Sequence, residues 1–398
     1  MTNIVFYFQV HQPFRLRHYS FFNIGQSHIY EAANLNFELL NRISDRCYLP
    51  ANEMLLKMIK DYGPDFRVAF SISGTALEQF EMYRPDVLDS FRRLLDTGQV
   101  ELLAETYFHS LAALYSPIEF VRQVTKYKAK LKSLFGYEAT TFRNTELIYD
   151  NAIAVQISKL GFKQIVAEGV DSYLDALSPT AAASHIFKAP GTNAPKLLLR
   201  QYRLSDDISF RFTEPSWPGY PLDADKYASW LRALAIEQRA ESINLFMDYE
   251  TFGEHRPLSS GILDFLYFLP KAVAAYPDMQ FATPSEVLAT AKPKKVYDVP
   301  KPTSWADDNR DISGWVLSHT QKDALKRVYT LEEAVMAKGS EALIHQWGKL
   351  QTSDHFYYMS TKYWGDGVRE VFSPYKSPFD AYINYMNVLA DFEQTIKG

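Results

Sequence analysis

The feature that most limits how this chain can fold is a regular alternation from its start to about position 290. Short apolar runs of strand length recur, separated by longer segments whose apolar residues have helical spacing. The predicted helices include Glu78–Leu95, Ile118–Phe135, Lys226–Ala240 and Leu263–Tyr276. The predicted strands are Ile4–Val10, Arg67–Ser73, Val100–Ala104, Thr140–Arg143, Gln164–Ala167, Leu197–Tyr202, Ile243–Met247 and Gln280–Thr283. Strands interleaved with helices indicate βαβ units and a parallel sheet, and about seven repeats favour a closed or nearly closed α/β barrel.

Polar residues follow most of these strands at the point where the strand ends. His11-Gln12-Pro13 follows the first strand, Asn144-Thr145-Glu146 follows the fourth and Asp248 follows the seventh. Catalytic groups of (β/α) barrels sit at the carboxyl ends of the strands. The sequence therefore predicts an active site at that end of the barrel. Alternation along a strand would send Asp248 and Glu250 to the same side.

The character of the chain changes after about position 290. The segment 291–305 is rich in proline and lysine, and it is the predicted linker because prolines cannot lie inside a helix. Helical periodicity then returns, which gives three expected units: 1–290 as the barrel, 291–305 as the linker and 306–398 as a helical bundle. The loop Thr352–Ser377 carries many aromatic and acidic residues, Trp364 among them, and is expected to form part of the substrate cleft.

Composition narrows the class of function. The net charge is −5 and no basic stripe occurs, which argues against a nucleic-acid partner. No run approaches the ~18 apolar residues of a membrane span, and the first residues enter a strand without a signal peptide. A single cysteine, Cys47, excludes an internal disulfide framework. A soluble cytoplasmic protein without a cofactor is the expectation. Aromatic residues make up 15% of the chain, which suits sugar ligands.

Two acids at the ends of different predicted strands, Glu146 and Asp248, form the sharpest chemical pair. Cleavage of a glycosidic bond needs one carboxyl group to protonate the leaving oxygen and another to attack or to activate water. Their separation, about 5–5.5 Å for retention and roughly 6.5–9.5 Å for inversion, distinguishes the two outcomes. Arg143 and Asn144, just before Glu146, are expected to keep it ionised through charge and hydrogen bonds. A structural Arg143–Glu146 ion pair is the alternative.

Five short motifs resemble the signature regions of glycoside hydrolase family 57, and they occur in the same order. They are His11-Gln12-Pro13, Gly98-Gln99-Val100-Glu101, Phe142-Arg143-Asn144-Thr145-Glu146, Met247-Asp248-Tyr249-Glu250-Thr251-Phe252-Gly253 and Leu350-Gln351-Thr352-Ser353-Asp354-His355-Phe356-Tyr357. The resemblance covers essentially the whole chain. It implies an incomplete (β/α)7 barrel, similar to a TIM barrel, followed by an α-helical bundle. It also implies a retaining α-amylase-like enzyme or a 4-α-glucanotransferase acting on α-1,4-glucans.

The resemblance also implies roles for single residues. Glu146 looks like the nucleophile and Asp248 like the acid/base, a choice that spacing alone does not make between Asp248 and Glu250. His11 would hydrogen-bond the sugar next to the scissile bond, and Glu101 would contact the same sugar or orient a neighbouring residue. Asp354 would reach in from the helical bundle. Weaker candidates for the walls of the substrate cleft are Trp217, His255 and Tyr357. The fifth motif departs from the family in having His355-Phe356-Tyr357 where tryptophan is common.

Two other classes of function stay open. His11, His109, Asp248 and His255 near strand ends would suit a zinc-dependent glycosidase or deacetylase, although tight His-x-His spacings are absent. A non-catalytic glucan-binding protein would keep the barrel and the aromatic cleft without using the acid pair. Hydrolysis and transfer share the covalent intermediate and differ only in whether water or a sugar hydroxyl reaches it.

Overall fold

Seven parallel strands form a ring at the centre of the protein. The computed structural model describes residues 1–362 and 373–397 of the chain. The ring consists of β1 (Thr2–Val10), β2 (Val68–Ile72), β3 (Val100–Leu102), β4 (Thr141–Arg143), β5 (Gln164–Glu168), β7 (Lys196–Arg200) and β8 (Ser242–Asp248). Strands β3 and β4 meet only through the bridge Ala104–Phe142, and β7 and β8 pair only at Arg200 and Asn244. The predicted seven-stranded barrel is therefore confirmed, with two thin seams.

All eight predicted strands are present, with bounds shifted by one or two positions in most cases. The eighth is β9 (Met279–Phe281), which adds to the first residues of β1 outside the ring. Two further strands, β6 (Phe187–Lys188) and β10 (Lys295–Val296), pair parallel with each other and were not predicted. Strands this short do not show the alternation on which such a prediction depends.

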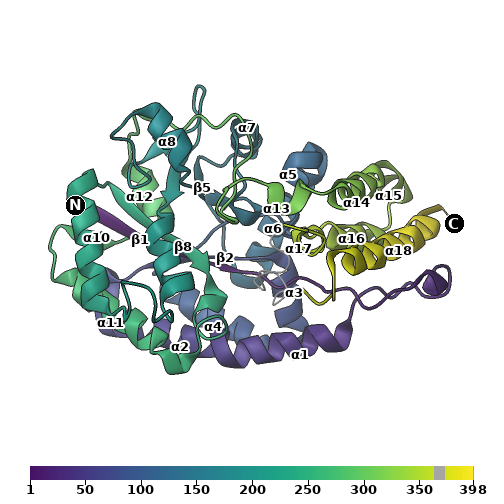
Figure 1. The fold of residues 1–398 in the computed structure, drawn as a ribbon, viewed down its shortest axis with the longest axis horizontal. Helices are drawn as coiled ribbons and strands as arrows, with labels where there is room; N and C mark the ends of the chain where they lie inside the picture. The colour runs from purple at the N-terminus through teal and green to yellow at the C-terminus, as the bar shows by residue number, and fades with distance from the viewer. Residues whose placement is uncertain (363–372, 398) are drawn as a thin grey trace.

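Helices surround the ring, as Figure 1 shows. The predicted helix Glu78–Leu95 is two helices, α3 (Gly74–Tyr83) and α4 (Pro85–Asp96), because Pro85 has no N–H to continue the hydrogen-bond ladder. The other three predicted barrel helices are α6 (Pro117–Phe135), α10 (Ala224–Gln238) and α11 (Ile262–Ala274). The remaining ones are α1 (Ala33–Ile43), α2 (Leu49–Tyr62), α5 (Ala112–Tyr115), α7 (Asn151–Lys159), α8 (Asp171–Leu177), α9 (Tyr202–Asp206) and α12 (Pro284–Thr290).

The two faces of the central strands are both buried but differ in character. In β1 the even residues Ile4, Phe6 and Phe8 join the large apolar core between strands and helices, whereas Val5 and Tyr7 join a small cluster inside the ring. Toward the carboxyl end the interior becomes polar. There Gln9 accepts hydrogen bonds from the hydroxyls of Tyr7 (2.8 Å) and Ser71 (2.7 Å). Every second residue of β1 faces the interior of the ring, and these residues change from apolar to polar toward the end of the strand.

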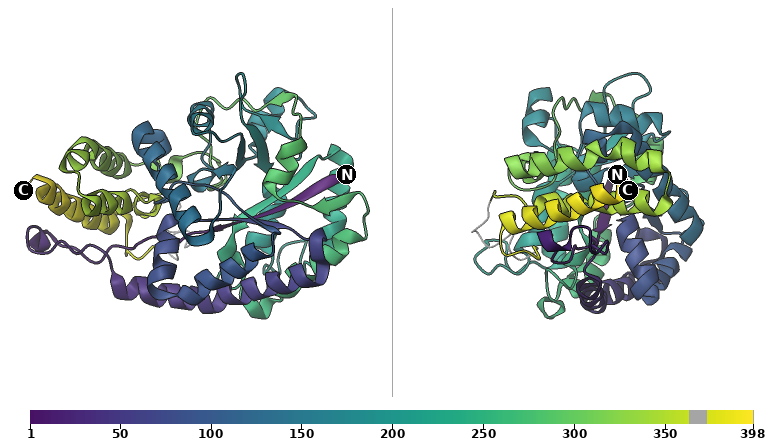
Figure 2. Two further views of the ribbon diagram at one scale, coloured as in Figure 1. Left: turned by 180° about the vertical axis from the view of Figure 1, so that it is seen from behind. Right: turned by 90° about the vertical axis from the view of Figure 1, so that its right-hand side faces the viewer.

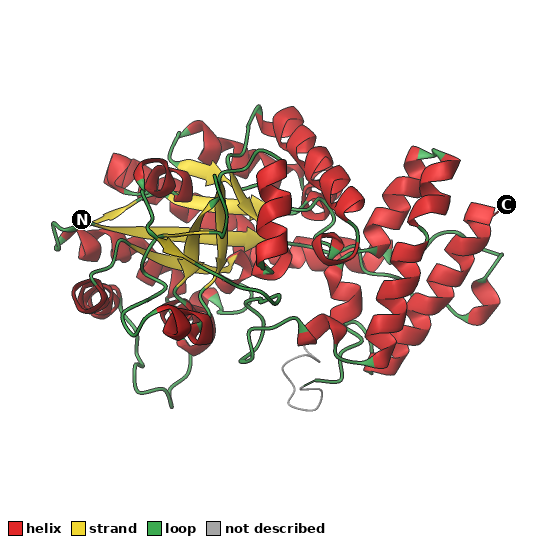
Figure 3. Cartoon of the chain, turned by 90° about the horizontal axis from the view of Figure 1, so that it is seen from above, coloured by secondary structure: helices red, strands yellow, loops and turns green. Residues whose placement is uncertain are grey.

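The helical C-terminal region lies at the end of the barrel toward which the strands point, as the arrowheads in Figure 3 show. It comprises α13 (Ser313–Val316), α14 (His319–Thr330), α15 (Glu332–Lys338), α16 (Glu341–Leu350), α17 (Ser353–Tyr357) and α18 (Pro378–Lys397). The two termini lie at opposite ends of the long axis (Figure 2). The bundle is therefore placed to reach the carboxyl ends of the strands.

The predicted linker 291–305 is packed into the barrel region along part of its length. It contains β10, and its residues Tyr297 and Val299 are fully buried in the main core. The division into 1–290, 291–305 and 306–398 stays a proposal. Part of the predicted cleft loop, including Trp364, lies outside the described residues. No helix of the described part is long and apolar enough to span a membrane.

Candidate active site

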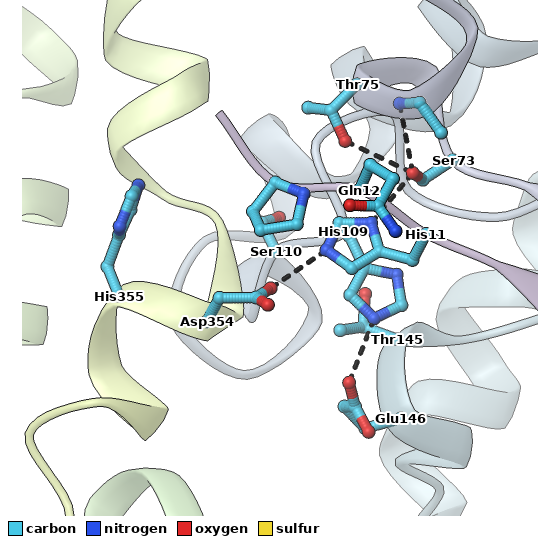
Figure 4. Close-up of polar contacts among 12 residues, drawn as sticks. His11, Gln12, Ser73, Thr75, His109, Ser110, Thr145, Glu146, Asp354 and His355 are labelled. Atoms are coloured by element: carbon cyan, nitrogen blue, oxygen red, sulfur yellow. Dashed lines mark hydrogen bonds and ion pairs between the residues drawn. The ribbon is translucent and has the colours of Figure 1, made fainter. Parts of the chain in front are cut away.

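Side chains from three strand ends and one helix of the bundle meet above the ring (Figure 4). His11 follows β1, His109 follows β3 and Glu146 follows β4, and Asp354 comes from the bundle helix α17. The bundle is tied to this place by backbone contacts as well. The N–H of Ser353 donates to the carbonyl of His109 (2.9 Å), and Ser110 forms an antiparallel bridge with Thr352. Motifs from the first and the last parts of the sequence therefore share one site.

Glu146 has both carboxylate oxygens hydrogen-bonded. His109 Nε2 lies 3.0 Å from Oε1, and the Trp305 indole Nε1–H donates to Oε2 at 2.7 Å. Burial favours the neutral acid, but the hydrogen bond and charge of His109, the charge of Arg143 and the Trp305 bond together lower the pKa of Glu146. About a quarter of its side chain (23%) is exposed. Glu146 is therefore held as a carboxylate that substrate can still reach.

The backbone at Glu146 is strained. Its φ is 55° and that of Leu147 is 51°. Both values lie in the left-handed region that side chains other than glycine rarely adopt. Such residues cost of order 1–3 kcal/mol each and cluster at functional sites. The backbone N–H of Trp305 also donates to the carbonyl of Glu146 (3.1 Å). Trp305 thus tethers this residue through both its main chain and its side chain.

Arg143 acts differently from the expectation. Its guanidinium is fully buried, lies 3.8 Å from Glu105 and stacks 5.1 Å from the Trp305 ring centre. None of the three guanidinium nitrogens has a hydrogen-bond partner among the described residues. Asn144 donates to the carbonyl of Ile148, closing the turn. The expected hydrogen bonds from Arg143 and Asn144 to Glu146 are therefore wrong, although the charge of Arg143 does contribute.

The imidazole rings of His11 and His109 stack face to face, with centroids 3.9 Å apart. His11 Nε2–H donates to Asp354 (2.8 Å), and the Ser73 hydroxyl lies 2.7 Å from His11 Nδ1. Burial and the charge of His109 lower the pKa of His11, whereas its pairing with Asp354 opposes this. The charge and hydrogen bond of His11 outweigh burial and lower the pKa of Asp354.

Asp248 is the last residue of β8 and lies beside Gln9 in the register of β1 and β8. Burial and the charge of Glu146 raise its pKa to about 6, against the opposing charges of Arg143, His109 and Arg200. The strand ends at Asp248, so alternation does not orient Glu250 as predicted. Glu250 instead accepts hydrogen bonds from Tyr48 and from Gln12 (3.4 Å), and burial raises its pKa to about 8.

The other predicted site residues lie in different surroundings. Glu101 accepts hydrogen bonds from the Thr141 hydroxyl (2.6 Å) and the Ser285 N–H (2.9 Å), which ties β3 to β4 and to α12. Trp217 packs edge-on against Trp230 of α10. Burial lowers the pKa of His255 to about 4 in the loop after β8. Tyr357 lies on α17 with Asp354, its ring centre 5.7 Å from that of Trp315.

The histidines do not converge as metal ligands do. His11 and His109 present ring faces to each other, and their nitrogens point to separate acids. In residues 1–362 and 373–397, no group of three or more His, Cys, Asp or Glu side chains is placed to hold a metal ion. Neutral nitrogens pointing at one position would be needed for the zinc interpretation.

Two contributors to the site were not among the predicted site residues, although one of them, Glu105, follows a predicted strand. Glu105, at the end of β3, accepts from His109, and Trp305 falls at the end of the predicted linker. The sequence suggested His109 only as a metal ligand. A tryptophan at the end of a proline-rich segment is the one signal available for Trp305, since an aromatic side chain is unusual in a linker.

Comparisons with known proteins bear on the family to which this chain belongs. The model of the family "Glycosyl hydrolase family 57" matches residues 5–300. A "Putative alpha-amylase" of Methanocaldococcus jannaschii is 40% identical over 99% of this chain and 85% of its own length. A "4-alpha-glucanotransferase" of Thermococcus litoralis is 27% identical, but over only 32% of this chain and 18% of its own.

Solved structures share the fold. A family 57 branching enzyme of Thermococcus kodakaraensis has a TM-score of 0.68 at 13% identity, covering 91% of this chain and 86% of that one. The α-amylase AmyC of Thermotoga maritima has a TM-score of 0.65 at 13% identity, covering 100% and 94%. The match of the family model over most of the chain, together with a relative at 40% identity over nearly all of it, shows that this chain belongs to glycosyl hydrolase family 57 and is a glycosidase or transferase of that family.

Proposed function

We propose that the protein is a retaining, α-amylase-like hydrolase of α-1,4-glucans, with Glu146 as nucleophile and Asp248 as acid/base. The observation that carries the proposal is the contrast between the two acids. Glu146 is bonded to two donors that lower its pKa, whereas burial and the neighbouring negative charge raise that of Asp248 to about 6. Carboxyl groups whose environments push their pKa values apart are suited to these two roles.

The reaction follows from these protonation states. The Asp248 carboxyl gives its proton to the glycosidic oxygen as the carboxylate of Glu146 attacks the anomeric carbon. The bond to the leaving sugar breaks and a glycosyl ester forms on Glu146. Asp248, now ionised, takes a proton from a water molecule, and the resulting attack releases the sugar and the carboxylate. The anomeric configuration inverts twice and is retained.

His11 and Asp354 are proposed to bind the sugar next to the scissile bond. Asp354 keeps 22% of its side chain exposed while bonded to His11, and both residues lie beside the proposed nucleophile (Figure 4). Tyr357, on the same helix as Asp354, is proposed as a wall of the cleft. Glu101 and Trp217 are left out of the proposed site, because their contacts join them to other parts of the fold. His255, in the loop after β8, stays a proposed wall of the cleft.

Transfer to a second sugar, as in a 4-α-glucanotransferase, is the second candidate, because a relative named for that activity matches about a third of the chain (32%). An acceptor hydroxyl would then replace water in the second step. A relative that is 40% identical over 99% of the chain is named "Putative alpha-amylase", which favours hydrolysis.

The test is product analysis on a defined maltooligosaccharide with wild type, Glu146→Gln and the exposed control Glu138→Gln. We expect shorter oligosaccharides from wild type and control, and a loss of roughly 10⁴-fold or more in Glu146→Gln. Proton NMR of the first product should show the α-anomer. Longer chains would assign transfer, a β-anomer would exclude retention, and an active Glu146→Gln would exclude Glu146 as nucleophile.

A further inference from the structure

Glu105 is a buried carboxylate that lies outside the five family motifs. It also takes no part in the steps of the proposed reaction. It lies at the end of β3 with no exposed surface. Its Oε1 accepts from Gln9 Nε2 at 3.3 Å, and its Oε2 lies 3.0 Å from His109 Nδ1 and 3.8 Å from Arg143. Burying a carboxylate this deeply costs free energy unless neighbouring groups pair with its charge and hydrogen-bond to it.

His109 lies between two acids. Its Nδ1 faces Glu105 and its Nε2 faces Glu146, each at 3.0 Å. A carboxylate only accepts hydrogen bonds, so both ring nitrogens must carry a proton to make both bonds. Burial by itself lowers the pKa of His109, but the bonds to Glu105 and Glu146 outweigh it and raise the pKa to about 9. The ring is therefore an imidazolium at neutral pH.

Other charged and titratable groups also face this ring. His11 stacks on it, Arg143 comes from β4, Asp248 from β8 and Asp354 from α17. Arg143 disfavours the imidazolium, and His11 is a second titratable ring in contact with it. Without the carboxylate of Glu105, only Glu146 and Asp354 would stabilise a proton on the stacked rings of His11 and His109.

We infer that Glu105 is a positioning residue of the proposed reaction: its carboxylate keeps His109 protonated, so that a fixed positive charge and an N–H face Glu146. Glu105 acts through His109, because it has no exposed surface with which to touch substrate. The arrangement is rigid. His109 has φ 52° and its carbonyl accepts from the Ser353 N–H of the bundle, which fixes the ring between the two acids. The inference rests on the proposed role of Glu146.

The experiment is the pH dependence of kcat/KM for Glu105→Gln. The amide oxygen still accepts from Nδ1–H, so the ring keeps its place while the negative charge is lost. We expect a fall of about 10–100-fold, the usual scale for an outer partner of a reacting group, mainly in kcat. The acid limb of the profile, where Glu146 is protonated, should move to higher pH. The control is Asp391→Asn, because Asp391 is a buried carboxylate of α18 bonded to Tyr30 and His28, and it should leave the limb in place.

A double-mutant cycle tests whether Glu105 works through His109. The effect of Glu105→Gln should nearly vanish in a His109→Gln background, since the group it acts on is gone. Additive effects, or a folded Glu105→Gln variant with an unmoved acid limb, would overturn the inference. A loss of activity in Glu146→Gln alongside that result would leave the proposed function standing.

A direct measurement covers the case in which Glu105→Gln does not fold. In wild type labelled with ¹⁵N-histidine, both ring nitrogens of His109 should show imidazolium shifts at pH 7.5 and titrate near pH 9. The His109→Gln spectrum assigns the signals. Neutral imidazole shifts for His109 at pH 7.5 would overturn the inference whatever the activity of the variants.

Discussion

The ends of β4 and β8 present the same kind of group in opposite surroundings. At the end of β4, Glu146 meets an imidazolium and an indole N–H, and it remains ionised. At the end of β8, burial and the charge of Glu146 raise the pKa of Asp248 to about 6. Free Asp is slightly more acidic than free Glu. The comparison shows that the neighbours of each carboxyl reverse this order, which supports the two proposed roles.

The largest effects should come from removing either acid, and the choice of substrate should separate them. Asp248→Ala is expected to lower kcat on a maltooligosaccharide by roughly 10²–10⁴-fold, the usual contribution of general acid catalysis. Glycosylation by an activated aryl α-glucoside needs no proton and should be largely spared. Glu146→Ala should abolish both reactions. Equal losses on both substrates in Asp248→Ala would show that the roles are assigned wrongly. The measurement is kcat/KM with each substrate, because it reports glycosylation and not the later hydrolysis step, in which Asp248 acts as the base.

Trp305→Phe should have the next largest effect. The variant keeps a ring near Arg143 and Arg200 but removes the 2.7 Å hydrogen bond to Glu146. A neutral donor to an ionised acceptor contributes about 1.5–3 kcal/mol, which corresponds to roughly 10–100-fold in kcat/KM. Trp230→Phe, on α10, is the matched control. A loss that appears only in KM would assign Trp305 to substrate binding.

The wild-type pH profile sharpens the comparison further. The proposed mechanism requires Glu146 to be ionised and Asp248 to be protonated, so kcat/KM should be bell-shaped. Its acid limb should lie below the ordinary pKa of a glutamate, since the pKa of Glu146 is lowered. Its alkaline limb should lie near pH 6, where Asp248 loses its proton. A profile that stays flat to pH 9 would contradict the assignment of Asp248 as the acid.

The smallest effect on activity is expected from a change at Glu250, two positions past Asp248. Its expected effect is on stability. Burial raises its pKa to about 8, so the folded protein binds a proton there that the unfolded chain releases near pH 4.5. The contribution of Glu250 to the free energy of unfolding is fully present below pH 4.5 and is lost as the pH rises toward 8. Glu250→Gln, which keeps an acceptor for Tyr48, should flatten the fall in unfolding free energy between pH 5 and 8. Urea unfolding at both pH values measures it; an unchanged slope would contradict it.

The fold could be predicted well from the sequence because the spacing of apolar residues along strands and helices reflects which side chains are buried. Every predicted strand is present, and the predicted barrel helix that is split in two is the one containing Pro85. The motifs also located His11, Glu146, Asp248 and Asp354, since parallel strand ends and the bundle meet at one edge.

The partners of these residues were harder to predict. His109 and Glu146 have positive φ, and no periodicity describes the direction of a side chain on such a backbone. Glu101 was preferred because it lies in a motif, yet Glu105, one position beyond the bridge residue Ala104, is the acid that faces His109. Trp305 lies in a segment whose composition indicates a linker. Its role depends on a contact across 159 positions.

The long reach of these contacts has a consequence for how the protein is made. During synthesis His11 is made 343 positions before its partner Asp354. Trp305 and Asp354 both lie beyond position 300, where the match to the family model ends. A nascent chain that has completed every strand of the ring therefore still lacks the tether of its proposed nucleophile and one wall of its site. The proposed site is therefore complete only once the C-terminal helices have docked on the barrel.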